Sequence, residues 1–261
     1  MPASEHRPPP LGTRLGSVWF RHMRVYTRNL ISNGLPPFLE PVIFLLGIGI
    51  GLGRYLDAMD GVSYLVFLAA ALPVTSAMFT ASYECTFSTF VRLEYQKAYD
   101  GMLAAPVTVC DLFVGELLWA GTKGLFFSAC VVTVIALFGA IPMPMGLCAV
   151  PVGFLTGTMF GALALYVTSF VGNINHFNFY FTGVLSPMFF FAGTVFPLDR
   201  LPRVLRPLAE LMPLTHAVRL CRSLAIGRFS PVLLADLAFL VVVTIVAGHL
   251  AIRRLRRRLI V

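Results

Sequence analysis

Residue types that could perform bond chemistry are sparse and widely separated in this sequence. The nearest approach to a phosphate-binding loop is Gly121-Thr122-Lys123, which lacks the GxxxxGK[ST] spacing that surrounds phosphates with backbone N–H groups. Ser169 and His176 offer a nucleophile and a base, but no GxSxG or HExxH motif accompanies them. The five cysteines are dispersed without a CxxC pair, which disfavours a disulfide framework or a zinc site. We therefore expect no catalytic residue, no metal site and no cofactor bound by this chain.

Three ionisable residues fall within apolar segments, where each charge costs roughly 2.5–3.5 kcal/mol at the centre of a membrane. They are Glu40, Lys123 and Asp236. Lys123 lies two helical turns beyond Glu116 and shares a helix face with it. Lys123 then either extends toward the membrane surface and pairs locally, or lies on a transport path. Asp236 is expected to pair with an arginine of residues 197–230.

Residues 197–230 are predicted to form two short amphipathic helices, the second of which ends at Gly227. Neither helix is long enough to cross a bilayer, so the pair reads as an interfacial or re-entrant hairpin. His216, Arg219 and Arg222 share the polar face of the second helix. These side chains either contact phosphate headgroups or a phospho-lipid substrate, or pair internally with carboxylates. The candidate carboxylates are Asp199, Glu210 and Asp236.

Residues 84–115 form the longest predicted cytoplasmic connection between apolar segments. Apolar residues recur there at helical spacing among charged ones, and Pro106 ends the predicted helix. The apolar residues are Tyr95, Tyr99, Met102 and Leu103, and Asp100 lies among them. An apolar stripe on a helix in water must be covered by the chain's own helices, by the membrane surface or by a partner protein.

The remainder of the chain has the composition of a membrane protein. Hydrophobic residues make up 57% of the sequence and charged residues 12%, whereas a soluble domain carries about 25% charge. No charged residue occurs in the 75 positions between Lys123 and Asp199, which leaves room for most of three crossings of about 20 residues each. The net charge of +8 does not indicate nucleic-acid binding, because this distribution excludes a soluble fold.

The sequence predicts an all-α membrane protein with six transmembrane helices and no internal repeat. Residues 1–12 resemble a disordered tail, residues 13–34 an amphipathic interface helix with arginines on one side, and residues 253–261 a basic cytoplasmic tail. The six predicted spans are 35–53, 62–83, 116–139, 147–171, 177–196 and 231–252.

Flanking arginines set the expected orientation. Five arginines precede the first span and five follow the last, which indicates that both termini are cytoplasmic. With six spans, residues 197–230 must then face outside although they carry six arginines, against the charge rule.

Three stretches, in this order along the chain, resemble a known family. Residues 92–107, continued by 111–119, are similar to the cytoplasmic loop of type-2 ABC exporter permeases. Residues 186–198 resemble the fifth span of that family, and residues 212–227 resemble its outer loop, with Met212 where Asn is common. The resemblance covers nearly the whole chain and is closest to the permease branch that exports nodulation factors, or lipo-oligosaccharides.

The resemblance implies a multi-pass permease of the bacterial inner membrane that works as a homodimer with two separate ABC ATP-binding subunits. Those partner subunits would bind ATP and Mg, and residues 84–115 would carry a coupling helix that docks on them. We then expect Tyr99, Met102 and Leu103 to be the anchors, with Asp100 setting the orientation at the rim.

The expected substrate is amphiphilic, with a lipo-oligosaccharide or lipid-linked glycan first and a hydrophobic drug or polyketide as the alternative. An ion-coupled secondary transporter and a membrane enzyme are rival classes. A neighbouring gene for a lone ATPase would argue against both.

Overall fold

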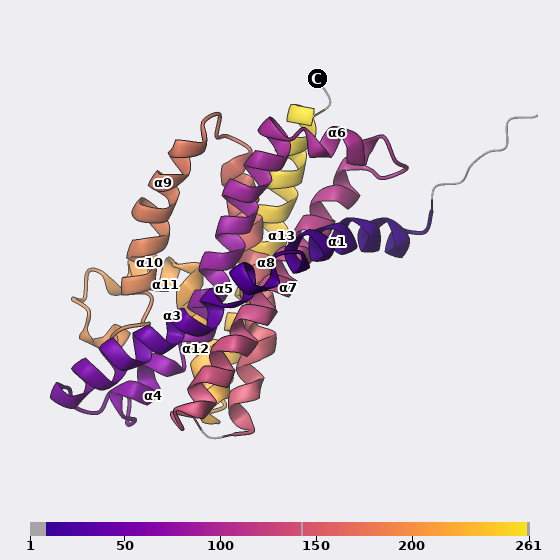
Figure 1. Cartoon of the computed structure of the whole chain (residues 1–261). Helices are drawn as coiled ribbons and strands as arrows, with labels where there is room; N and C mark the ends of the chain where they lie inside the picture. Colours follow the sequence, from indigo (N-terminus) through magenta and orange to yellow (C-terminus); the bar gives the residue numbers. More distant parts are fainter. Residues whose placement is uncertain (1–8, 142, 260–261) are drawn as a thin grey trace, which may run out of the picture.

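The computed structural model describes residues 9–141 and 143–259, and these residues form helices and no sheet (Figure 1). Within the described residues, five helices are long and apolar enough to cross a membrane. They are Leu30–Tyr55, Tyr64–Tyr95, Val109–Leu137, Met145–Thr168 and Val232–Leu259. The all-helical, multi-pass fold expected from the sequence is confirmed, and these five helices overlap the first four and the last of the predicted spans.

The predicted fifth span, 177–196, is not among the five. It is a shorter helix that runs without interruption through α9 (Phe177–Tyr180), a π-helical stretch (Phe181–Leu185) and α10 (Ser186–Phe191). Polar residues at its start lower its hydropathy, and Gly193, with φ 81°, turns the chain out of the helix. The described residues thus hold five helices that are long and apolar enough to cross a membrane, where the sequence predicted six spans.

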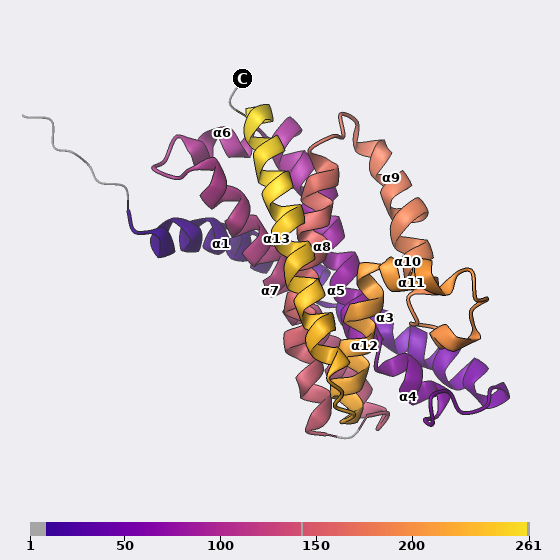
Figure 2. The same cartoon turned by 180° about the vertical axis from the view of Figure 1, so that it is seen from behind.

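Two short helices follow α10, as the sequence predicted. They are α11 (Arg206–Leu211) and α12 (Pro213–Ile226), and α12 ends at Gly227 in a left-handed conformation. In Figures 1 and 2, α9 lies toward the end of the molecule that holds the C-terminus of α13, and α12 lies in the opposite half.

The second predicted span is longer than expected. After α4 (Tyr64–Ala69), α5 (Leu72–Tyr83) continues without interruption through π-helical stretches at Glu84–Ser88 and Val91–Tyr95. The connection to the next helix is therefore much shorter than residues 84–115. It holds α6 (Ala98–Leu103) and ends where Thr108 and Asp111 form a capping box at the start of α7 (Val109–Leu137).

The closest helix contact lies between α7 and α8 (Ala149–Thr168), which meet through glycines. A Cβ atom on Gly124 would lie 2.5 Å from the Gly153 carbonyl oxygen, and one on Gly157 would lie 2.8 Å from the Ala120 carbonyl oxygen. Because only glycine leaves room for such an approach, these positions bring the two backbones into direct contact. Ser128 of α7 also donates to the Pro73 carbonyl oxygen at 2.7 Å, which ties α5 to the pair.

The N-terminal helix α1 (Leu11–Thr27) runs along α7. Trp19 Nε1 donates to Thr122 Oγ1 at 2.9 Å, and Val18 fills the space beside Gly115. The predicted disordered tail, 1–12, falls mostly on residues 1–8, which lie outside the described residues, and its end already belongs to α1. The chain then passes through α2 (Leu30–Gly34) and α3 (Pro36–Phe44) into the first candidate span.

The last helix, α13 (Val232–Leu259), extends to the final described residue, so the described part of residues 253–261 belongs to it and is no separate tail. Arg258 donates to the carbonyl oxygens of Thr168 and Val171 at 3.0 and 2.9 Å, and it pairs with Glu94 at 2.8 Å. These contacts place the end of α13 beside the connection that holds α6, and both views show the two at one end of the bundle (Figures 1 and 2).

Candidate functional site

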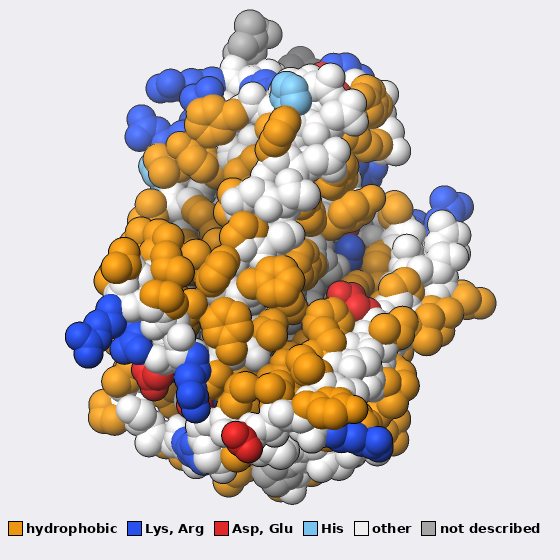
Figure 3. All heavy atoms as spheres, turned by 90° about the vertical axis from the view of Figure 1, so that its left-hand side faces the viewer, with side chains coloured by type: hydrophobic (Ala, Val, Ile, Leu, Met, Phe, Trp, Pro, Cys, Tyr) orange, Lys and Arg blue, Asp and Glu red, His pale blue; other side chains and the backbone are white. Residues whose placement is uncertain are grey.

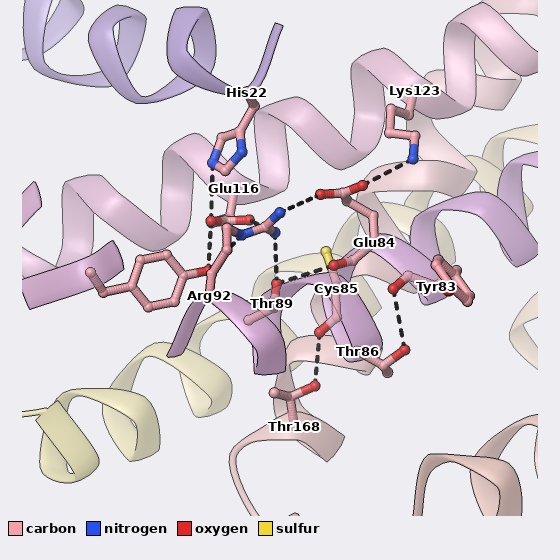
Figure 4. A network of polar contacts seen from close by, with 11 residues as sticks. His22, Tyr83, Glu84, Cys85, Thr86, Thr89, Arg92, Glu116, Lys123 and Thr168 are labelled. Carbon is pink, nitrogen blue, oxygen red and sulfur yellow. Dashed lines mark hydrogen bonds and ion pairs between the residues drawn. The ribbon is translucent and has the colours of Figure 1, made fainter. Parts of the chain in front are cut away.

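A buried polar cluster lies where α1, α6, α7 and the extension of α5 meet (Figure 4). The extension contributes two oppositely charged residues, and so does α7, while α1 and α6 contribute one aromatic side chain each. Its members are His22, Glu84, Thr89, Arg92, Tyr99, Glu116 and Lys123.

Arg92 is the centre of this polar cluster. Its guanidinium reaches Glu84 Oε1 and Glu116 Oε2, each at 2.8 Å, and Lys123 Nζ reaches the second oxygen of Glu84 at 2.9 Å. The helices that carry these residues run in opposite directions, so Glu84 meets Lys123 while Arg92 meets Glu116 (Figure 4). Two carboxylates thus face two permanent cations, which is the condition under which charge can be buried at moderate cost.

Tyr99 and His22 connect the polar cluster to the two peripheral helices. The Tyr99 hydroxyl donates to Glu116 Oε1 at 2.7 Å, and His22 Nε2 lies 3.0 Å from the same oxygen. His22 also stacks on Trp119, with the ring centroids 6.0 Å apart. Burial and the Glu116 carboxylate raise the pKa of Tyr99, so its hydroxyl remains a hydrogen-bond donor. Glu116 is thereby the point at which α1, α6 and α7 are joined.

The polar cluster also contains atoms spaced as metal ligands would be. One donor atom each from His22, Glu84 and Glu116 lie within 4.8 Å of one another. The Arg92 guanidinium already bonds to both carboxylates. Arg92 therefore supplies to the two carboxylates the positive charge that a bound metal ion would supply.

The expected anchors on the coupling helix are placed differently from the prediction. Tyr99 is only 1% exposed and its ring packs against Phe113, so it cannot insert into a partner and that expectation is corrected. Met102 and Leu103 are half-buried against the same core. Apart from Tyr95, the stripe is covered by the chain's own helices, which is the first of the three covers that the sequence allowed.

The opposite face of this connection is open. Tyr95 is 65% exposed, and Asp100 and Pro106 are exposed as well. Tyr95 and Asp100 flank Lys97, whose left-handed backbone, with φ 49°, turns the chain between the extended helix and α6. A protein that docks here meets these residues and not Tyr99.

The polar residues of α12 bond within the chain. Arg219 makes an ion pair with Asp236 at 2.8 Å and with Glu210 at 3.0 Å. His216 lies 2.7 Å from Asp236 through Nδ1, and its Nε2 lies 2.9 Å from the Glu210 carbonyl oxygen. The expected pairing of Asp236 with an arginine of 197–230 is present. We call these four residues the outer clamp, because they join α11, α12 and α13.

Arg222 does not belong to the outer clamp. Its guanidinium stacks 3.7 Å above the centroid of Phe67 and donates to the carbonyl oxygens of Phe67 and Gly193 at 3.2 and 2.8 Å. The described residues place no carboxylate in an ion pair with it. A cavity of about 520 Å³ opens beside Arg219 and Arg222, so both lie where an external ligand could reach.

The two other ionisable residues singled out in the sequence have contrasting surroundings. Lys123 is held by Glu84 across the helix interface and not by Glu116 on its own helix. Glu40 of α3 is exposed in the isolated chain and forms no ion pair with any described residue. It lines a small cavity of about 230 Å³.

The sequence comparison now identifies the family. A family model described as ABC-2 type transporter matches residues 13–226, which is most of the chain. The chain belongs to this family. It is the membrane permease subunit of such a transporter, a non-catalytic component whose family implies an ATP-binding partner subunit.

Relatives of this permease align over almost their full length. Nodulation protein J of Sinorhizobium fredii is 34% identical over 244 residues, which cover 94% of this chain and 93% of that protein. Nodulation protein J of Rhizobium meliloti is 35% identical over 245 residues and 93% of each chain. Inner membrane transport permease YadH of Escherichia coli is 23% identical over 204 residues, which cover 78% of this chain and 79% of that protein.

Sequence reasoning did not assemble the polar cluster of the permease. Glu84 and Arg92 were assigned to a cytoplasmic loop, and His22 carried no prediction. A signal was available: Glu84 and Arg92 are eight residues apart, Glu116 and Lys123 are seven apart, and two antiparallel helices bring such pairs into register. The signal can be recognised only if the second span continues through Arg92. The charged residues Glu84 and Arg92 argue against such a continuation when the sequence is considered alone.

Proposed function

We propose that this permease forms a homodimer with ATP-binding subunits docked at α6, and that it moves a lipo-oligosaccharide outward across the bacterial inner membrane. The names and near-complete alignment of the Nodulation protein J relatives support a substrate of this class. The name of the Escherichia coli relative supports the inner membrane. The partner subunits would bind ATP and Mg.

The observation that carries the proposed coupling is the hydrogen bond from Tyr99 to Glu116. α6 has only six residues and is too short to transmit movement unless it is fixed to a longer element. Tyr99 fixes it to α7, and Glu116 in turn contacts Arg92 and His22. A displacement of α6 by the partner would therefore reach three helices at once, which is how a local contact becomes a rearrangement of packed helices.

In the proposed topology the chain crosses the membrane six times, although only five of the crossings are single long helices. The helix formed by α9 and α10 begins at one end of the bundle, and α12 lies in the other half (Figures 1 and 2). Together they would carry the chain from one side to the other. Both termini and α6 would then be cytoplasmic, in line with the contact between Arg258 and Glu94.

Transport into inverted membrane vesicles tests the function. Vesicles that contain the permease and its ATP-binding partner should accumulate a labelled lipo-oligosaccharide only when ATP is supplied. Vesicles without the permease are the control for leakage and adsorption. ATP-dependent uptake of a hydrophobic drug without uptake of the lipo-oligosaccharide would replace the proposed substrate class.

A further inference from the structure

A small cavity lies between α3, α5, α7 and α10, away from the polar cluster and the outer clamp. Its volume is about 230 Å³, and it combines an apolar wall with a carboxylate and hydroxyl groups. Figure 3 shows the side of the molecule on which α3 and α10 lie, and most of that surface is hydrophobic. Mostly apolar cavities with a few polar groups are the usual form of small-molecule sites.

Two polar groups in the cavity are without partners in the described chain. Ser76 Oγ is buried and forms no hydrogen bond, whereas the neighbouring Thr75 hydroxyl donates to the Leu72 carbonyl oxygen at 3.0 Å. The Glu40 carboxylate forms no ion pair among the described residues. A buried hydroxyl without a partner destabilises the fold, and a charge within a membrane span does so more strongly. Both groups are therefore available to a ligand.

Three phenylalanines form the apolar wall of the cavity. Phe189 of α10 lies edge-on to Phe44 of α3 with the ring centroids 5.8 Å apart, and it is tilted against Phe79 of α5 at 6.1 Å. These contacts hold the rings in fixed orientations beside Glu40 and Ser76. A fixed ring presents a negative face to polarised C–H groups or to a cation.

We propose that this cavity binds a sugar ring of an amphiphilic ligand. Sugar hydroxyls would donate to the Glu40 carboxylate and accept from the Ser76 hydroxyl, while the C–H face of the ring would lie on the phenylalanines. An alkylammonium group would suit Glu40 and the rings, but it offers no acceptor for the Ser76 proton. The polar groups of the cavity therefore favour a neutral polyhydroxylated ring. The ligand is taken to be the transported substrate, which rests on the proposed function.

Protection of an introduced cysteine tests this site without requiring transport. Val131 lines the cavity and carries no polar group, so Val131→Cys supplies a reporter in a background of Cys110→Ser and Cys148→Ser, which removes the two exposed native thiols. The permease in nanodiscs is alkylated with N-ethylmaleimide while hexyl β-D-glucoside is titrated below its micellar concentration. Hexyltrimethylammonium is the matched cationic probe, and native Cys148 in the parent protein is the control thiol.

The glucoside should slow alkylation at position 131 at least tenfold, hexyltrimethylammonium at the same concentration should slow it clearly less, and alkylation of Cys148 should be unaffected. Glu40→Ala should raise the half-protecting glucoside concentration about tenfold or more, because a hydrogen bond to a charged group is lost. Glu40→Gln keeps an acceptor of the same shape and should raise it less. Equal or better protection by the ammonium compound, or protection unchanged in Glu40→Ala, would overturn the proposal. Intact protection without lipo-oligosaccharide export would instead refute only the proposed function.

Discussion

The Tyr99 hydroxyl and the Glu116 carboxylate lie 2.7 Å apart, and both side chains are buried. This single contact joins α6, which has six residues, to α7, which has 29. It also changes the role of Tyr99, which becomes the internal attachment of α6. In the proposed coupling, the residues that face the partner are exposed neighbours such as Tyr95.

Tyr99→Phe removes the hydroxyl and leaves the ring in place. We expect the permease to be destabilised by about 1.5–3 kcal/mol, since the lost hydrogen bond ends on a charged acceptor. Thermal unfolding of the purified protein would measure this, and ATP-driven transport should fall while the ATP-binding subunit stays bound. Tyr55→Phe is the matched control, because Tyr55 is exposed, makes no side-chain hydrogen bond within the described chain and lies outside the proposed docking surface. Equal stability and transport in both variants would exclude the coupling role of Tyr99.

Replacing the exposed face of the connection should loosen the partner without unfolding the permease. The double variant Tyr95→Ala, Asp100→Ala should co-purify much less ATP-binding subunit, because truncating an interface anchor costs about 2 kcal/mol or more. Its thermal unfolding should match that of the parent protein. Phe179→Ala, at another exposed aromatic residue, is the control for surface hydrophobicity. Undiminished co-purification of the double variant would move the docking surface elsewhere.

Arg92 should matter more than Lys123 for the polar cluster. Arg92→Met leaves Glu84 with Lys123 alone and Glu116 without a permanent cation, whereas Lys123→Met leaves both carboxylates bonded to Arg92. Breaking a buried ion pair costs about 3–5 kcal/mol, so we expect Arg92→Met to unfold at clearly lower temperature than Lys123→Met. The reverse order of the two unfolding temperatures would contradict the central position of Arg92.

The outer clamp should depend on Asp236 more than on Glu210. Asp236 is 1% exposed and bonds to both His216 and Arg219, while Glu210 is largely solvated. Asp236→Asn should therefore cost several kcal/mol in unfolding free energy, and Glu210→Gln about 1 kcal/mol or less. Denaturation of the two variants side by side provides the comparison. Similar costs would show that the buried carboxylate contributes no more than the solvated one.

A methyl group at the contact between α7 and α8 should disturb the bundle. In Gly157→Ala the new Cβ would lie 2.8 Å from a backbone oxygen of α7, so the helices must separate. Overpacking of this kind typically costs about 1–3 kcal/mol. Gly183→Ala meets nothing within 4 Å and is the control. If both variants unfold at the same temperature, the close approach of the helices does not contribute to stability.

Much of the fold could be predicted from the sequence because apolar length is a local property. The long helices around 62–83, 116–139, 147–171 and 231–252 all appear, with bounds that shift by a few residues or extend at one end. The extension of the second helix could not be predicted, since Glu84 and Arg92 look like loop residues unless their partners on α7 are known. The fifth span was overestimated for a related reason: its aromatic residues suggest a crossing, but polar residues at 175–178 and the turn at Gly193 shorten it.

The candidate site was predicted less well than the fold. Helical spacing found the stripe of Tyr99, Met102 and Leu103, but spacing cannot tell whether a stripe faces its own chain or a partner. Asp236 was predicted more successfully, because a buried carboxylate needs a compensating cation and residues 197–230 supply arginines close to it in the sequence. His22 could not be predicted, since its importance depends on how α1 packs along α7 in three dimensions.

The contact between Arg258 and Glu94 has a practical consequence for spectroscopy. It fixes the end of α13 beside the segment that leads into α6, so a fluorescent donor attached near Arg257 would report from the immediate vicinity of that segment. An acceptor dye on the ATP-binding subunit would then give energy transfer as the two proteins assemble. Watching that signal during turnover would reveal in real time whether the subunits separate or stay together through each cycle.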